Sequence, residues 1–284
     1  MINEPLVSIL IPVYNGGKYL NLTIRKLLDQ TYQNIEIIIS DNNSQDDTKN
    51  ICSKFSKLDN RIIYYKQDSN IGMIKNELFL TQKIKGKYFC WMPAGDFSNK
   101  DFIKCGVEHL DSNDDTISCF GETICFDNKM NNFKKFGITE LFSDDLQNRI
   151  KNFCNVQIHD HLLYGLHQSK VAQIIKPELG YIGPEMLQLF NILMLGKYKG
   201  VKGMQFYKHY PNPKKLSRDL NGKAILYNVK LNQISKHGIY LLIIKKIFKN
   251  FNYFVSLYLI SKLVIKRLMY RFKLIKVIYE PPEL

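Results

Sequence analysis

The chain has 284 residues, 45% of them hydrophobic, and its 40 Lys and Arg against 26 Asp and Glu give a formal net charge of +14. This length allows one large domain, or one domain with an appendage, and the apolar content can bury a sizeable core, which argues against disorder. A basic surface attracts nucleic acid, anionic lipid or phosphorylated small molecules, and net charge alone does not choose among them.

The first part of the chain alternates between short apolar runs and segments with helical spacing. Strands are predicted over residues 6–13, 35–40, 61–66 and 87–92. Helices are predicted over residues 18–30, 46–57, 73–83 and 99–110. Ser44 precedes the second helix and is expected to be its N-cap. The alternation predicts an α/β fold, with a mostly parallel sheet covered by helices on both faces.

From residue 117 onward the pattern loosens. A further strand is expected over 117–126 and a helix over 144–153, and residues 160–174 carry an apolar stripe. Residues 184–195 predict an amphipathic helix that begins with a proline and ends before a glycine. Residues 209–217 contain two prolines and are expected to form a loop.

Ligands of parallel α/β sheets bind at the carboxyl ends of the strands. Neither G-x-G-x-x-G nor G-x-x-x-x-G-K-[ST] occurs there, which argues against a dinucleotide-binding or a P-loop site. The segments found there are SILIPVYNGGKYL, IEIIISDNNSQDDT, DSNIGMIKNELF and YFCWMPAGD. In order and spacing this series resembles the GT-A glycosyltransferases of family 2. The resemblance covers the first hundred residues or so and extends more weakly to about 215, so residues 1–215 are assigned to a GT-A domain.

The resemblance implies a nucleotide at the ends of the first three strands. An aromatic ring such as Tyr14 can stack on a base, and the carboxylate of Asp41 can accept a hydrogen bond from a uracil N–H. Two plainer interpretations remain, a strand-end aromatic for Tyr14 and a turn-forming aspartate for Asp41. The implied nucleotide-binding residues are Pro12, Tyr14, Asn15, Asp41, Asn70, Gly72 and Asn76.

The family usually carries several aspartates after the fourth strand, where they hold Mg²⁺ or Mn²⁺ against the donor diphosphate. Here Pro93 and Gly95 replace two of these acids, and Asp96 remains. One carboxylate with diphosphate oxygens can still hold a metal, but the departure leaves metal dependence open. A helix cap or turn residue is the alternative role for Asp96. Without a metal, basic side chains must offset the diphosphate charge, and the candidates are His209, Lys214 and Lys215.

The resemblance also implies that the sugar is transferred with inversion at its anomeric carbon. Such a reaction requires a carboxylate that takes the proton of the acceptor hydroxyl. By resemblance this acid stands at the start of an amphipathic helix after the YGL segment, and Glu185 falls on that position. An acid in the first turn also simply suits a helix dipole. Glu178 is the second candidate.

Residues 216–284 differ in composition. Between Tyr240 and Tyr279 nine Lys and Arg residues interleave with apolar ones, and no acid occurs before Glu280. Such a basic amphipathic helical region is typical of contact with an anionic membrane or a partner, although a packed helix with a solvated basic face has the same pattern. No signal peptide is evident. The expected location is the cytoplasm, peripherally at the inner membrane face.

The sequence therefore predicts an inverting hexosyl- or N-acetylhexosaminyltransferase. It would move a sugar from a nucleotide-activated donor, expected to be a UDP-sugar, to a lipid-linked or surface-glycan acceptor in polysaccharide biosynthesis. The alternative is a non-catalytic GT-A domain that binds a nucleotide sugar or glycan, or acts as a partner subunit. Nucleic acid is not an expected ligand, because the basic residues concentrate in the tail and no RNA-binding signature is present.

Overall fold

The computed structural model describes residues 4–137, 145–155, 163–174, 184–210, 238–252, 255–256 and 259–260. Its helices and strands confirm the alternating order predicted for the first part of the chain. In chain order they are β1 (Val7–Val13), α1 (Gly17–Leu28), β2 (Ile35–Asp41), α2 (Thr48–Leu58), β3 (Ile62–Lys66), α3 (Met73–Thr81), β4 (Tyr88–Trp91), β5 (Phe97–Ser98), α4 (Phe102–Asp111), β6 (Thr116–Phe126), β7 (Asn132–Phe136), α5 (Leu146–Asn155), β8 (Leu166–Gln168), the 3₁₀ helix Ser169–Gln173, α6 (Pro184–Leu195), β9 (Lys197–His209) and α8 (Gly238–Asn250).

Within the described ranges the strands form one sheet in the order β3-β2-β1-β4-β8-β6-β9-β5, with β7 paired to β6. β1 lies between β2 and β4, β3 flanks β2, and all three pairings are parallel, as predicted. Beyond β4 the sheet becomes mixed. β8 is antiparallel to both β4 and β6, whereas β9 runs parallel to β6. The parallel half therefore directs the carboxyl ends of β1, β2 and β4 to one edge.

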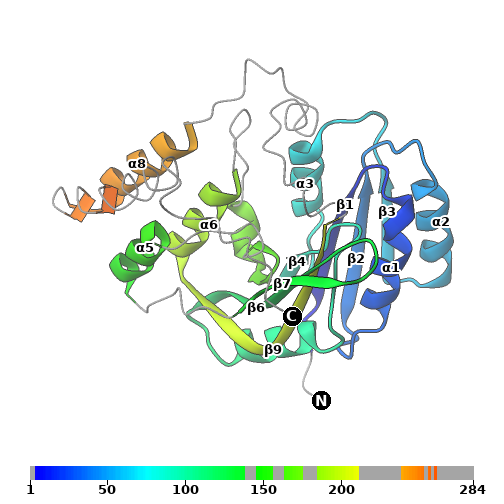
Figure 1. The fold of residues 1–284 in the computed structure, drawn as a ribbon, viewed down its shortest axis with the longest axis horizontal. Helices are drawn as coiled ribbons and strands as arrows, with labels where there is room; N and C mark the ends of the chain where they lie inside the picture. The colour runs from blue at the N-terminus through cyan, green and yellow to red at the C-terminus, as the bar shows by residue number, and fades with distance from the viewer. Residues whose placement is uncertain are drawn as a thin grey trace.

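Helices cover both faces of the sheet (Figure 1). The side chains of β1 alternate between the two faces, because successive residues of a strand point to opposite sides. Ile9 and Ile11 pack in one core cluster with residues of α1, α2 and α4. Leu10 belongs to the other cluster, which includes buried residues of α5, α6 and α8.

Two local predictions are corrected, and one segment that had no predicted structure is now described. Ser44 is not the N-cap of α2, because that helix begins at Thr48 and Asp47 occupies its N-cap. Within residues 160–174, the described part forms a short strand, β8, and a 3₁₀ helix. His209 does not begin a loop; it is the last residue of β9, a strand that was not predicted. β9 contains many lysines and glycines, so it lacks the continuous apolar run of a buried strand.

The predicted helix over 184–195 is present as α6, and it is more deeply buried than an amphipathic surface helix: Leu187, Leu189 and Phe190 are at most 2% exposed. α8 packs against α6 through Ile243 and Ile247, which are fully buried. Within the C-terminal region α8 is thus docked on the domain, and the division at residue 215 stays a prediction. None of the helices in the described part of the chain combines the length and the apolarity needed to cross a bilayer.

Candidate functional site

The turns that follow β1 and β2 are joined by hydrogen bonds. The main-chain N–H of Asn15 donates to Ser44 Oγ (2.8 Å), and the N–H of Gln45 donates to Asn15 Oδ1 (2.9 Å). Asn15 has φ of 51°, in the left-handed region that asparagine tolerates better than most residues. Ser44 is therefore a bridge between two turns, and Asn15 is locked at the edge of the sheet.

Pro12 and Tyr14 lie at the end of β1, as predicted. Pro12 pairs with Ser40 in the β1–β2 register, while Tyr14 follows the strand and is 50% exposed. The exposed ring is accessible for stacking on a base.

Asp41, at the end of β2, is fully buried. Its Oδ1 accepts the N–H of Ser44 (2.8 Å), and its Oδ2 accepts the hydroxyl of Tyr64 (3.0 Å). Burial and the neighbouring carboxylate raise the pKa of Tyr64 well above its usual value, so the hydroxyl stays protonated and donates. A nucleobase can reach Asp41 only where Tyr64 or the Ser44 turn gives way. Tyr64 was not identified from the sequence, because its partner lies on another strand.

The turn before α3 is tied to the end of β2 by two amides. Asn42 donates from Nδ2 to Asn70 Oδ1 (2.9 Å) and accepts the N–H of Ile71 at its own Oδ1 (2.9 Å). Asn70 Oδ1 also accepts the N–H of Gly72 (2.9 Å), whose φ of 84° favours glycine. The structure thus brings Asn70 and Gly72 to the same edge as Asp41, with Asn42 as a link that the sequence did not reveal.

Asn76 is also near this edge, but its amide is engaged inside the chain. It is 2% exposed, donates to the Ser40 carbonyl (2.9 Å) and accepts the Ser40 hydroxyl (2.6 Å). In this geometry Asn76 fastens α3 to β2 behind the predicted nucleotide-binding residues.

The turn after β4 contains Asp96, which is 5% exposed. The Thr23 hydroxyl, from α1, accepts the N–H of Gly95 (2.9 Å) and donates to the Asp96 carbonyl (2.8 Å). Asp101 occupies the N-cap of α4, so the alternative role of Asp96 as a helix cap is excluded. Thr23, which the sequence did not single out, holds the turn in place.

His209 lies at the same turn, although its sequence separation from Asp96 is 113 residues. Its main-chain N–H donates to Asp96 Oδ1 (2.8 Å). The imidazole lies against the Tyr19 ring, with centroids 4.5 Å apart. Burial and the positive charge of Lys18 lower the pKa of His209, with the Asp127 charge acting in the opposite direction. Two predicted diphosphate-site residues, Asp96 and His209, are therefore brought together.

Four other candidate residues are described only in part or lie outside the described residues. Glu185 occupies the first turn of α6, as predicted, but only its backbone is among the described residues. Lys214 and Lys215 lie outside the described residues, as does Glu178.

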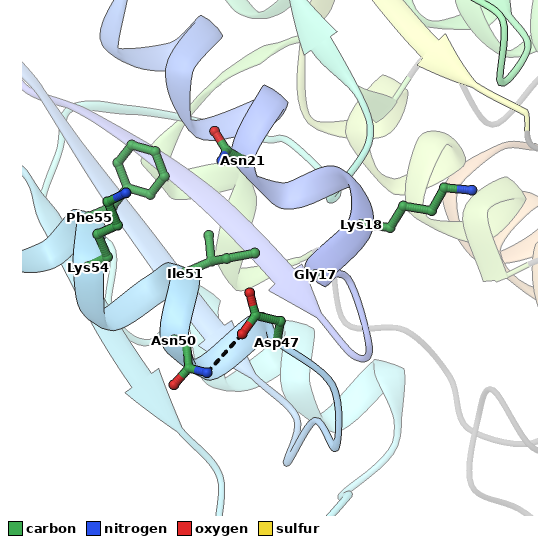
Figure 2. A pocket seen from close by; sticks show the side chains of 8 residues that line it. All are labelled: Gly17, Lys18, Asn21, Asp47, Asn50, Ile51, Lys54 and Phe55. Atoms are coloured by element: carbon green, nitrogen blue, oxygen red, sulfur yellow. Dashed lines mark hydrogen bonds between the residues drawn. The ribbon is translucent and has the colours of Figure 1, made fainter.

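A pocket of about 400 Å³ lies between α1 and α2, away from this turn (Figure 2). Asp47 accepts a hydrogen bond from Asn50 there (2.8 Å), and the Lys18 side chain points away from the other labelled side chains. Its lining includes none of the predicted donor-site residues. The lining residues are Gly17, Lys18, Asn21, Asp47, Asn50, Ile51, Lys54 and Phe55.

The family model described as "Glycosyl transferase family 2" matches residues 8–165. This match spans β1 to the residue before β8, and it contains every nucleotide-binding residue inferred above together with Asp96. The chain belongs to glycosyl transferase family 2.

Two bacterial relatives show how far the sequence similarity extends. Glycosyltransferase GlyG of Streptococcus pneumoniae is 30% identical over 150 residues, which is 51% of this chain and 50% of GlyG. An uncharacterised glycosyltransferase of Rickettsia prowazekii, RP339, is 36% identical over 136 residues, covering 42% and 41%. This family 2 chain thus matches half or less of the length of these relatives.

The fold is similar to that of Staphylococcus aureus TarS, whose crystal structure in complex with UDP-GlcNAc superimposes with a TM-score of 0.64. The match covers 91% of this chain and 71% of the TarS chain at 13% identity. The predicted GT-A fold is confirmed.

The Gly95–Asp96 turn offers few ligands for a divalent metal. No cluster of three or more His, Cys, Asp or Glu side chains that could hold a metal occurs among the described residues. Asp96 and His209 lie together at the turn. Asp96 carries a carboxylate and His209 an imidazole, and both groups can ligate a metal ion. One carboxylate and one imidazole fit a cation such as Mn²⁺ only if substrate oxygens and water complete its coordination.

We expect Thr23→Val to destabilise the protein. Valine keeps the shape of the side chain but leaves the Gly95 N–H and the Asp96 carbonyl without their partner, and each buried unpaired group costs about 1–3 kcal/mol. Urea unfolding should show a free energy of unfolding lowered by about 2 kcal/mol. Thr23→Ser retains the hydroxyl and should lose clearly less; equal losses in the two variants would show that the hydroxyl does not hold the turn.

Proposed function

We propose that this family 2 glycosyltransferase moves a hexosyl or N-acetylhexosaminyl group from a UDP-sugar to a glycan or lipid-linked acceptor with inversion. The observation that carries the proposal is the convergence of Tyr14, Asp41, Asn70, Asp96 and His209 at one edge of the sheet, inside or beside the family match. The UDP-GlcNAc complex of TarS, a neighbour in fold, supports the donor class.

The base and ribose would lie along the ends of β1, β2 and β3. Tyr14 supplies an exposed ring for stacking. Asp41 would accept a hydrogen bond from a uracil N–H once the Tyr64 hydroxyl releases Oδ2. The backbone at Asn15 and Gly72, with positive φ, would border the bound nucleotide. A carboxylate can select among nucleobases, because it accepts a hydrogen bond from a ring N–H and cannot pair with a ring nitrogen that only accepts.

The diphosphate would lie at the Gly95–Asp96 turn. Asp96 and His209 would hold a divalent cation there, and a bound cation neutralises charge on the leaving diphosphate. Lys214 and Lys215 follow His209 closely in sequence and are proposed to add positive charge on the same side.

The acceptor would be activated by Glu185 at the start of α6. Its carboxylate would take the proton of the acceptor hydroxyl while the oxygen forms a bond to the anomeric carbon. The bond from that carbon to the diphosphate oxygen breaks, and the nucleoside diphosphate leaves with the electron pair. Attack opposite to the leaving group accounts for inversion.

The acceptor class and the location of the enzyme are proposed from the tail. α8 buries Ile243 and Ile247 against the domain and leaves Lys245, Phe248 and Lys249 exposed. A basic and aromatic outer surface suits anionic lipid headgroups. A relative in Bacillus subtilis, 30% identical over 109 residues, is named a putative teichuronic acid biosynthesis glycosyltransferase, TuaG, which supports a cell-envelope polysaccharide. We therefore place the enzyme peripherally at the cytoplasmic face of the inner membrane.

Calorimetry with UDP, and with GDP as the control nucleotide, tests the donor site in Mn²⁺ and in EDTA. UDP should bind at least about tenfold more tightly than GDP, a difference of about 1.4 kcal/mol. Asp96→Asn keeps an acceptor for the His209 N–H but should reduce the increase in UDP affinity that Mn²⁺ produces. Asp114 is an exposed acid in the loop before β6, and Asp114→Asn should leave that increase unchanged. Absence of UDP binding in both conditions would contradict the donor. Equal UDP affinity in EDTA would mean that His209, Lys214 and Lys215 bind the diphosphate without a metal ion.

Glu185→Gln should abolish transfer while leaving UDP affinity unchanged. A general base contributes about 10²–10⁴-fold to the rate, so release of UDP from a UDP-sugar in the presence of acceptor should fall by that factor. Glu178→Gln is the matched control and should retain activity. Transfer that survives in Glu185→Gln would remove this residue from the mechanism, and turnover absent from the unaltered chain would favour the non-catalytic alternative.

Lys245→Glu with Lys249→Glu should weaken binding to vesicles that contain anionic lipid. Each lysine near such a surface contributes about 1 kcal/mol, so the double reversal should lower the affinity at least about tenfold in a sedimentation assay. Lys54→Glu with Lys57→Glu changes the charge equally on exposed positions of α2. Equal loss in both pairs would mean that net charge, and not α8, determines binding.

A further inference from the structure

The turn between β6 and β7 is fixed beside the donor-site turn. Asp127 Oδ1 accepts the N–H groups of Lys129 (2.8 Å) and Asn131 (3.0 Å), and the Asp127 N–H donates to the Asn131 carbonyl (3.1 Å). The N–H of Tyr210 donates to the Phe126 carbonyl (2.8 Å), which ties the end of β6 to the residue after β9. The turn therefore holds its next residue, Asn128, in a defined place.

Asn128 joins three separate segments through one atom. Its Oδ1 accepts the hydroxyl of Tyr19 from α1 (3.1 Å) and lies 3.0 Å from Nε2 of His209 at the end of β9. The ring of His209 is also enclosed by Phe126 and Tyr19, with centroids 5.2 and 4.5 Å away. Its orientation is thus set by packing, and its ring hydrogen bond goes to Asn128.

This hydrogen bond decides which nitrogen of His209 carries the proton. An amide oxygen only accepts, so Nε2 must be the donor, and a neutral imidazole with Nε2–H has a lone pair at Nδ1. The bare Nδ1 is therefore a consequence of the β6–β7 turn.

Nδ1 lies at the Gly95–Asp96 turn. A Cβ atom on Gly95 would be 3.2 Å from it, and Asp96 Oδ1 holds the His209 backbone. No group in the described part of the chain forms a hydrogen bond to Nδ1. A lone pair cannot donate to a phosphate oxygen, but it can ligate a cation that neutralises phosphate.

We propose that Asn128 is a positioning residue that holds His209 in the Nε2–H tautomer, so that Nδ1 ligates a divalent cation at the donor-diphosphate turn. This inference rests on the proposed function and decides one point within it, because His209 then meets the diphosphate through the cation and not by direct hydrogen bonding. Asn128 touches neither substrate nor cation; it acts through His209, as second-shell partners of metal ligands do, with typical effects of 10–100-fold on metal affinity.

The tautomer is measured directly on the full chain, labelled with ¹⁵N, at about pH 8 without nucleotide, where a neutral imidazole prevails. Long-range ¹⁵N–¹H spectra identify His209 by the signals lost in His209→Gln. The unaltered chain should show a protonated Nε2 and a bare Nδ1. Asn128→Leu should show a mixture of both tautomers, whereas Asn128→Asp retains the acceptor and should keep the Nε2–H form. Asn132→Leu, an exposed amide on the same hairpin, should change nothing.

Calorimetric titration with Mn²⁺ in saturating UDP supplies the second measurement. Asn128→Leu should weaken the Mn²⁺ affinity at least about tenfold, and Asn132→Leu should leave it unchanged. A protonated Nδ1 in the unaltered chain, or an Asn128→Leu spectrum identical to it, would overturn the proposal. Failure of the chain to bind UDP would contradict the proposed function instead, because the tautomer spectra are recorded without nucleotide.

Discussion

The hydrogen bond from the His209 main-chain N–H to the Asp96 carboxylate is the contact on which the site depends. It joins the end of β9 to the turn after β4 across 113 residues of sequence. A carboxylate that is 5% exposed must be stabilised by such bonds, because burying an unpaired charge costs several kcal/mol. β9 also pairs with β5 and β6, so this bond links the mixed part of the sheet to the turn after β4.

The contact also gives a physical reason for glycine at position 95. The residue has φ of +104°, where a side chain is strained, and a Cβ would press on the His209 imidazole. An acid at this position is incompatible with the ring as it stands. In the proposed cation site, the imidazole from β9 would serve beside Asp96 as a neutral nitrogen ligand, so its tautomer would matter.

The two halves of the sheet have different tasks. The parallel half positions the proposed nucleotide site through main-chain turns and the amides of Asn15, Asn42 and Asn70. In the mixed half, polar groups hold the scaffold: His167 is fully buried, bonds to Ser118 and the Leu163 carbonyl, and has a pKa lowered to about 4 by burial. That ring stays neutral at physiological pH and keeps β8 attached to β6.

Apart from the two-residue strand β5, the strands and helices from β1 to α4 were predictable from sequence, because strands buried on both faces leave continuous apolar runs and helices leave a periodic stripe. β7 and β9 were not predicted, because their lysine-rich, partly exposed segments become strands only by pairing with β6. The resemblance to family 2 was likewise visible in short motifs, and it located Asp41, Asp96 and Glu185 as candidates.

What the sequence by itself determined is therefore the α/β class, the family and the residue types available at the strand ends. Only the tertiary structure decided that Tyr64 covers Asp41, that Thr23 braces the Asp96 turn, and that Asn128 meets His209. The physical reason is that these contacts join residues 23, 73 and 81 positions apart, and no local periodicity or turn preference encodes a hydrogen bond between segments that meet only when the sheet is assembled.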